Sequence, residues 1–423
     1  MRAIKTVLLG CCLLLTIGLN AQYFGQNKTL YENFEFKVSE TPTFRIYHYL
    51  ENDSLLEQLA MSSEQWYHFH QRILRDTFTE KNPIIFYNDH ADFQQTNTIG
   101  GQISVGTGGV TEGLRNRVIM PLAMSNQQTN HVLGHELVHA FQYHMIINGD
   151  STSLNNLANL PLWMVEGLAE YLSIGSVDAH KQLSNPKYFP YRYGQAFWAF
   201  LTGIYGDDII EPFFTGVAKY GFEVATKKVL GTDSKALSEL WVNTIKKTFG
   251  EHLEGKEKGA VGKQLINREN AGRINVAPVI SPNGKYIIFL SEKDLFTTDL
   301  FLADARSGKI IRKVASAAKD GHIDDFNYIE SAGTWSPDGK EFAYVAFSKG
   351  RNILVINDVE KGKTVEERVL DGVPAFSNPS WSPDGKEIVV VGLVQGQTDL
   401  YSIQLKSGKV KQLTNDKYAE MHP

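Results

Sequence analysis

Apolar side chains recur at two different spacings between residues 44 and 90. FRIYHY and NPIIFYND are short runs of β-branched and aromatic residues, which is typical of strands. Between them, SLLEQLAMSSEQWYHFHQRIL carries apolar residues three and four positions apart, and this period predicts an amphipathic helix. This part of the chain is therefore expected to fold as strand, helix and strand.

The mixed pattern continues to about residue 249. TIGGQISVGTGGVTEG is too rich in glycine for a helix and is expected to form a hairpin or loop. RNRVIMPL is predicted to be a short strand, with Pro121 near its end, where a strand can spare one backbone donor. Helical patterns then dominate in TNHVLGHELVHAFQYHMI, PLWMVEGLAEYLS, YRYGQAFWAFLTGIYG and SKALSELWVNTIKKTF. Residues 22–255 are thus predicted to form one α+β domain.

The hydrophobic pattern changes after residue 255. Residues 256–272 are polar, contain glycines and lack an apolar period, which predicts a linker. Beyond it, SPNGKYIIFLS, SPDGKEFAYVA and SPDGKEIVVVG recur roughly every 50 residues. Each repeat joins a tight turn to a strand, and Asp338 and Asp384 are expected to form these turns.

A period of this length with several strands in each unit indicates propeller blades. WSPDGK resembles the blades of Tol-type periplasmic β-propellers; the resemblance covers roughly residues 273–420 and implies a fold rather than an activity, and residues 273–423 are predicted to form the propeller domain. Three blades do not close a ring, which typically needs about four to eight. We therefore expect an all-β, incomplete propeller of three blades, in a chain truncated at its C-terminus.

The first 21 residues have the pattern of a secretory signal peptide. Arg2 and Lys5 precede an apolar run from Val7 to Leu19, and the small Ala21 closes it. The alternative is an uncleaved membrane anchor, but the run is shorter than the roughly 20 residues that a spanning helix needs. Cleavage after Ala21 would give a secreted or periplasmic protein without a membrane span and without cysteine, since both cysteines lie in the leader.

The length and the net charge of the chain limit the classes of protein to which it can belong. A chain of 423 residues with 42% hydrophobic residues is long enough for two cores. The formal net charge of -5 is spread without long blocks of one sign, so no basic surface for nucleic acid is predicted.

The most specific chemical signal is HELVH within the predicted helix that begins near Thr129. Residues four apart lie on one face of a helix, so His135 and His139 can present two ring nitrogens to one metal ion. Glu136 would then stand beside the open coordination position, where a carboxylate can act as general base. This arrangement predicts Zn²⁺ bound by two histidines, although the same ligands accept other divalent ions.

A catalytic zinc needs a third protein ligand, and WMVEGLAEY on the next predicted helix supplies candidates. Glu166 follows His139 by enough residues for the chain to leave one helix and return antiparallel to it. Glu170 lies one helical turn further on the same face.

HELVH and WMVEGLAEY together resemble the gluzincin metallopeptidases. The resemblance implies a zincin-like α+β domain in which His135, His139 and Glu166 bind zinc and Glu136 is the general base. It further implies that Glu170 orients a zinc-binding histidine through a hydrogen bond. The chain departs from the better-known members by having valine, rather than asparagine, immediately before Glu166.

Two further expectations follow from the same resemblance. RNRVIMPL resembles the edge strand along which zincins bind extended peptides by strand addition. No residue matches the transition-state donor of these enzymes clearly, and Tyr193 is the candidate for stabilising the oxyanion, with aromatic packing at a helix start as the alternative.

Three functions are compatible with these observations. The leading hypothesis is an exported zinc peptidase acting on peptides or proteins, with a propeller that recruits or screens substrate. The second is a non-catalytic scaffold in which zinc stabilises the first domain and the propeller binds a protein partner. The third is an enzyme that hydrolyses a non-peptide bond, for instance in a cell-wall polymer.

Overall fold

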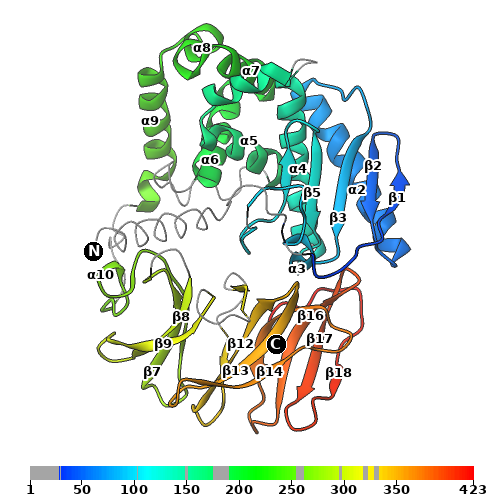
Figure 1. The fold of residues 1–423 in the computed structure, drawn as a ribbon. Helices are drawn as coiled ribbons and strands as arrows, with labels where there is room; N and C mark the ends of the chain where they lie inside the picture. Colours follow the sequence, from blue (N-terminus) through cyan, green and yellow to red (C-terminus); the bar gives the residue numbers. More distant parts are fainter. Residues whose placement is uncertain are drawn as a thin grey trace, which may run out of the picture.

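The computed structural model describes two adjoining parts, a mixed α/β part and a group of antiparallel sheets (Figure 1). It describes residues 28, 30–101, 103–147, 151–174, 190–253, 262–294, 298–317, 323–327 and 333–423. The predicted leader, residues 1–21, lies outside the described residues. No helix in the described ranges is long and apolar enough to cross a membrane.

A five-stranded mixed sheet forms one layer of the α/β part. Its strands lie in the order β1-β2-β3-β5-β4, with β2, β3 and β5 parallel and the two outer strands antiparallel to their neighbours. The strands are β1 (Lys37–Glu40), β2 (Phe44–His48), β3 (Asn82–Tyr87), β4 (Val110–Glu112) and β5 (Arg117–Pro121). The predicted strands FRIYHY, NPIIFYND and RNRVIMPL are therefore present.

The position of RNRVIMPL in the sheet corrects the prediction. This segment forms β5, which lies inside the sheet, whereas the edge strand is β4, from the glycine-rich segment expected to be a hairpin or loop. Val118, Ile119 and Met120 are all fully buried, so both faces of β5 are covered. Continuous burial on both faces is the property of an inner strand rather than of an edge.

Helices cover the sheet and build the rest of the α/β part. α4 contacts β4, β5, α2 and α5, so it lies at the centre of this part. The main apolar core joins α2, α4 and the later helices around large buried residues such as Trp198, Phe141 and Phe213. The helices are α2 (Asp53–Leu74), α3 (His90–Phe93), α4 (Asn126–Ile147), η1 (Ser151–Asn159), α5 (Leu162–Ile174), α6 (Pro190–Tyr205), η3 (Asp207–Ile209), α7 (Ile210–Tyr220), α8 (Phe222–Val229) and α9 (Ser234–Leu253).

α5 and α6 cross at a pair of glycines. A Cβ on Gly167 would lie 2.2 Å from the Cα of Gly194, and a Cβ on Gly194 would lie 1.7 Å from the carbonyl oxygen of Trp163. Real side chains cannot occupy these positions, so the two backbones touch only because both residues are glycine. The crossing fixes α5, the helix that carries Glu166 and Glu170, against α6.

The segment predicted as a linker, residues 256–272, is structured in its described second half. α10 (Arg268–Ala271) is capped at its N-terminus by Asn267, whose side chain accepts hydrogen bonds from the backbone amides of Glu269 and Asn270. Ala271 is fully buried against Phe289 and Phe301. The end of this segment therefore packs onto the first repeat.

The C-terminal part consists of three antiparallel sheets of four or five strands. Their strands are β6 (Asn275–Ile280), β7 (Tyr286–Ser291), β8 (Asp299–Asp304) and β9 (Ile310–Ser316); β10 (Asp325–Phe326), β11 (Thr334–Trp335), β12 (Glu341–Ser348), β13 (Arg351–Asp358) and β14 (Lys363–Arg368); and β15 (Ala375–Trp381), β16 (Glu387–Val394), β17 (Gln397–Gln404) and β18 (Val410–Gln412). Each repeat of the sequence thus corresponds to one sheet, as expected for blades.

The repeated SPDGK turns are held by the side chains that the sequence singled out. Ser336 donates a hydrogen bond to Asp338 across 2.7 Å, and Ser382 donates to Asp384 across 2.7 Å. In each turn the aspartate also accepts the amide of the lysine two residues later. Asp338 and Asp384 are therefore turn formers, as predicted.

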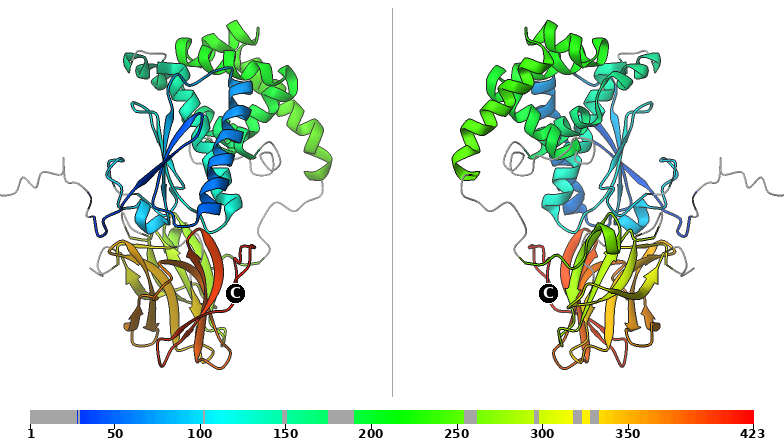
Figure 2. Two further views of the ribbon diagram at one scale, coloured as in Figure 1. Left: turned by 90° about the vertical axis from the view of Figure 1, so that its right-hand side faces the viewer. Right: turned by 90° about the vertical axis from the view of Figure 1, so that its left-hand side faces the viewer.

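Two hairpin turns of the sheets dock onto the α/β part, which stands above them in both views of Figure 2. In the turns Lys349–Gly350 and Gln395–Gly396 both residues have positive φ, the geometry of type I′ hairpins. The Glu51 amide donates to the Gln395 side chain, and Gly396 lies directly against Leu55. The two parts therefore share a packed junction.

Candidate metal centre and active site

α4 carries the HELVH residues into the interior of the α/β part. His135, Glu136 and His139 are each less than 9% exposed, although all three are polar. Buried polar groups require partners, because leaving them unpaired costs free energy. The surroundings of these three side chains therefore show what the site is built to hold.

Glu166 of α5 meets both histidines, as the sequence predicted. The Nε2 atoms of His135 and His139 lie 3.1 Å apart, and the Glu166 Oε2 atom lies 3.3 Å from the first and 3.4 Å from the second. Nitrogen and oxygen ligands about 2.0–2.2 Å from a tetrahedral zinc would be separated by about 3.3 Å. The three donor atoms thus have the spacing of one face of a zinc coordination tetrahedron.

The electrostatics of this triangle favour a bound cation. Burial alone would lower the pKa of His139, but its hydrogen bond with Glu166 and the charges of Glu136 and Glu166 outweigh burial and raise the pKa to about 9. Burial alone would raise the pKa of Glu166, but its hydrogen bonds with the two histidines outweigh burial and lower the pKa to about 2. The raised pKa of His139 reports the negative potential of the two carboxylates, which favours positive charge in the triangle, and the lowered pKa of Glu166 reports the positive charge of the neighbouring histidines.

Gln142 fixes the ring of His139, and sequence reasoning missed it. The His139 Nδ1 atom lies 2.8 Å from the Gln142 Oε1 atom, while the Gln142 Nε2 atom donates to the carbonyl oxygen of Val165 across 3.0 Å. This pairing leaves the Nε2 atom of His139 free to face Glu166. The available signal was the three-residue spacing on α4, which places Gln142 beside His139.

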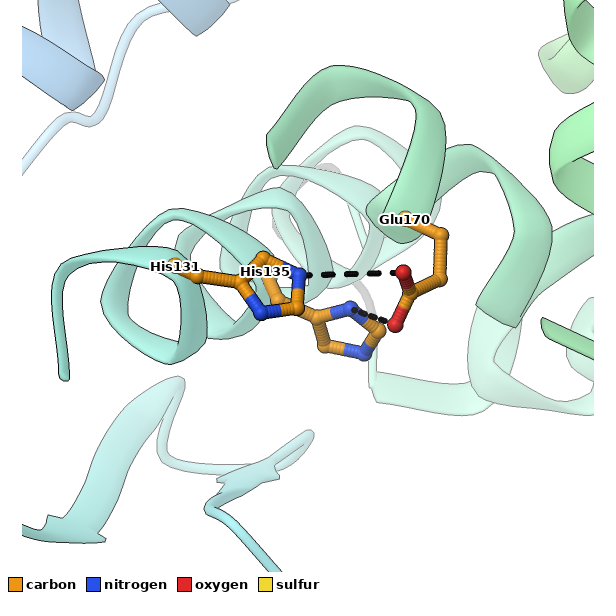
Figure 3. A group of neighbouring side chains, drawn as sticks. All are labelled: His131, His135 and Glu170. Atoms are coloured by element: carbon orange, nitrogen blue, oxygen red, sulfur yellow. Dashed lines mark ion pairs between the residues drawn. The ribbon is translucent and has the colours of Figure 1, made fainter. Parts of the chain in front are cut away.

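Glu170 lies one turn after Glu166 and faces the other ring nitrogen of His135. Its Oε1 atom is 3.6 Å from the His135 Nδ1 atom, and its Oε2 atom is 3.7 Å from the Nε2 atom of His131 (Figure 3). Burial alone would raise the pKa of Glu170, but its pairing with His131 and the charges of His131, His135 and Arg192 outweigh burial and lower the pKa. His131, which the sequence analysis did not single out, therefore belongs to this polar row.

Glu136 is held by the edge strand β4. The Thr111 hydroxyl lies 2.8 Å from the Glu136 Oε2 atom and 2.9 Å from the Glu136 backbone oxygen. A Cβ on Gly109 would lie only 2.8 Å from the Glu136 Cγ atom, so this glycine lets the strand approach the carboxylate. The candidate base thus stands directly beside the free edge of the sheet.

The structure does not bring Tyr193 to the cluster and corrects this prediction. Its ring packs edge-on against Trp163 and Trp241 in the helical core. Tyr191, two positions earlier on α6, instead lies 5.9 Å from the His135 ring between centroids. Residues two apart face nearly opposite sides of a helix, which explains why only one tyrosine can reach the site.

Tyr191 has the electrostatic surroundings of a residue in the site. Burial, the charges of Glu166, Glu136 and Glu170, and a hydrogen bond with Glu166 raise the pKa of its phenol to about 12. The phenol therefore stays protonated at neutral pH and can act as a hydrogen-bond donor.

Two family models match parts of this chain. Residues 322–423 match the model described as TolB beta propeller domain, so the C-terminal part is a TolB-type β-propeller region that follows a mixed α/β part. Residues 114–243 match the model described as peptidase of plants and bacteria, and this range includes the HELVH residues and Glu166. Neither match reaches half of the chain. None of the curated proteins matches it.

Several solved structures share limited similarity with the chain. TolB from Acinetobacter baumannii is 22% identical over 34% of this chain and 32% of its own, with a TM-score of 0.28. Oligogalacturonate lyase in complex with manganese is 24% identical over 33% of this chain and 36% of its own, with a TM-score of 0.26. Pyrococcus horikoshii acylaminoacyl peptidase is 19% identical over 33% of this chain and 24% of its own, with a TM-score of 0.24. The chain therefore spans about a third of the TolB structure, and likenesses this low carry no argument about activity.

Proposed function

We propose that the protein is an exported zinc-dependent peptidase whose reaction centre lies between α4, α5 and β4. The observation that carries this proposal is the triangle of His135, His139 and Glu166, whose donor spacing suits tetrahedral zinc and which lies next to the buried Glu136. The match of residues 114–243 with a peptidase family supports the same class.

The number of ligands favours a catalyst over a zinc-stabilised scaffold. Within the ranges that the structure describes, this donor group consists of three side chains. Structural zinc sites use four protein ligands, whereas catalytic sites use three and keep one position for water or substrate. A three-ligand group next to the Glu136 carboxylate, which is not one of the three donors, therefore fits catalysis better.

Each nearby side chain has a role in this proposal. Zinc held by the three ligands would act as a Lewis acid toward the scissile carbonyl and make a water molecule more acidic. Glu136, positioned by Thr111, would accept the proton of the attacking water and pass it to the leaving amine. The Tyr191 hydroxyl would donate a hydrogen bond to the developing oxyanion, the role first predicted for Tyr193.

The substrate is an extended peptide in this account, because β4 offers the free backbone edge beside Glu136. An extended chain can add to such an edge through main-chain hydrogen bonds. Export is supported by the signal pattern of residues 1–21 and by the TolB-type propeller region. The propeller would serve to recruit or screen substrate.

The direct chemical test is Glu136→Gln, with Glu223→Gln on the exposed face of α8 as the matched control. We expect Glu136→Gln to retain its metal and to lose about 10²–10⁴-fold in kcat on a peptide library, the usual contribution of a general base. Cleavage at the parent rate in this variant would refute the mechanism. A parent that hydrolyses a cell-wall polymer but no peptide would move the proposal to non-peptide bonds.

A further inference from the structure

A cavity of about 240 Å³ lies where the α/β part and the propeller region meet. We call it the junction cavity. Its α/β wall is formed by the start of α3, the loop before β4, the end of β5 and the first turns of α4, and its propeller wall by Asn327 and residues of β12, β13, β15 and β16. The first wall includes Gly108, Gln128 and Val132, and the second includes Phe347, Asn352, Ala375, Phe376 and Leu393.

The junction cavity adjoins the proposed reaction centre. Gln128 and Val132 line the cavity, and Glu136 follows one helical turn after Val132 on the same face of α4. Gly108, which touches Val132, also lines it, and the adjacent Gly109 touches Glu136. The backbone that leads into β4 therefore links the cavity to the candidate base.

The lining of the junction cavity suits a bulky apolar group. Phe347, Phe376 and Leu393 face Val132 across it, and the pocket is apolar over most of its surface. The side-chain oxygen of Asn352 and both ring nitrogens of His90, which also line the cavity, are buried without a hydrogen-bond partner, so the cavity also offers a few polar groups. Small-molecule sites typically measure about 300–1,000 Å³, so this volume suits a side chain rather than a separate ligand.

We propose that the junction cavity is a specificity subsite, shared by both parts, that receives a bulky apolar side chain of the peptide next to the scissile bond. The inference rests on the proposed peptidase function and adds a substrate class to it. It also gives the propeller a direct role in choosing the bond that is cleaved, because a third of the residues that line the subsite belong to it.

Two variants on the propeller wall test this subsite in the full chain. Ala375→Phe should fill it and lower kcat/KM at least tenfold for peptides with leucine or phenylalanine at one position near the scissile bond, but not for matched peptides with alanine there. Phe347→Ala should enlarge it and shift the preference at that position toward tryptophan. Phe289→Ala, buried in the first sheet away from the cavity, is the matched control.

The outcomes separate this inference from the proposal on which it rests. A change of preference confined to one peptide position in either variant, with metal content and folding by circular dichroism unchanged, would support the subsite. Unchanged preference in both folded variants, or an equal loss for all peptides, would overturn it while leaving the peptidase intact. A parent chain that cleaves no peptide would overturn the proposed function itself and the subsite with it.

Discussion

Glu136, His135 and His139 each have a polar partner that sets the direction of the side chain. Thr111 holds Glu136, Gln142 holds His139, and Glu170 faces His135. Such partners typically change metal affinity or activity 10–100-fold, because they orient the groups that do the chemistry. At the scale of the residue, each of these three side chains is therefore oriented by a polar partner and none stands alone.

At this scale we predict that Tyr191, and not Tyr193, is the tyrosine of α6 that donates a hydrogen bond to the oxyanion. Tyr191→Phe should lower kcat by about 10²–10³-fold, the cost of removing one oxyanion donor, with little change in metal content. Tyr193→Phe should keep kcat near the parent value, because its ring packs among Trp163 and Trp241. Steady-state kinetics on one cleaved peptide decides this, and a larger loss in Tyr193→Phe would restore the prediction made from the sequence.

The residues of the site differ in how far the sequence could reveal them. Helical spacing, which local sequence encodes directly, predicts the pairs His135/His139 and Glu166/Glu170, whereas the meeting of the two pairs was implied by the resemblance to gluzincins. Thr111 contacts Glu136 from 25 residues away on another element, and no spacing rule connects them. Tyr191 and Tyr193 are equally plausible from the sequence, because the rotation of α6 is set by packing against α5.

At the scale of the element, the crossing of α5 and α6 determines where Glu166 and Glu170 lie. Both helices were predicted from their apolar period. The close contact between the two helices could not be predicted, because a glycine within a helical pattern does not show which neighbouring helix it approaches. The edge strand was missed for a related reason: β4 has three residues within a glycine-rich segment, too few for a strand period.

Glycine substitutions in these helices should have opposite effects on stability. Gly167→Ala should lower the free energy of unfolding by about 3 kcal/mol, because its Cβ would overlap the backbone of α6. Gly203→Ala, on the exposed side of α6 where a Cβ meets nothing, should raise it by about 0.5–1 kcal/mol through helix propensity. Urea unfolding measures both values, and similar effects at the two positions would contradict the close crossing.

At the scale of the whole molecule, the repeats predicted the three sheets but not their docking. The contacts that join the two parts link residues more than 300 positions apart, such as Arg351 with Glu32 and Gln395 with Glu51. Hydrophobic periods encode local elements, whereas such distant pairs depend on how finished domains fit together. For this reason the junction cavity could not be predicted from the sequence.

The junction also contains a buried carboxyl group that should make stability depend on pH. Asp92 of α3 accepts the Tyr49 hydroxyl across 2.6 Å, and burial together with the neighbouring Asp89 raises the pKa of Asp92 to about 8. The unfolded carboxyl group has a pKa near 4. Between about pH 4 and pH 8 the folded chain therefore binds more protons than the unfolded chain, and the free energy of unfolding falls as pH rises.

Asp92→Asn keeps an acceptor for Tyr49 and removes the titration, so it should lose less stability than the parent between pH 5 and pH 8. Asp338→Asn is the contrast, because hydrogen bonds with Ser336 and Lys340 lower the pKa of Asp338 and its contribution is lost only below about pH 4. Urea unfolding at both pH values measures the slopes. A slope in Asp92→Asn equal to that of the parent would exclude Asp92 as its source.

The measurement that tests the central claim most directly is the metal content of the full chain by elemental analysis. The parent and the control Glu223→Ala should each hold about one zinc per chain, and Glu166→Ala should lose most of it, because two histidines alone bind zinc weakly. Zinc bound equally well after the loss of Glu166, or no zinc in the parent, would contradict the three-ligand centre and the proposed mechanism with it.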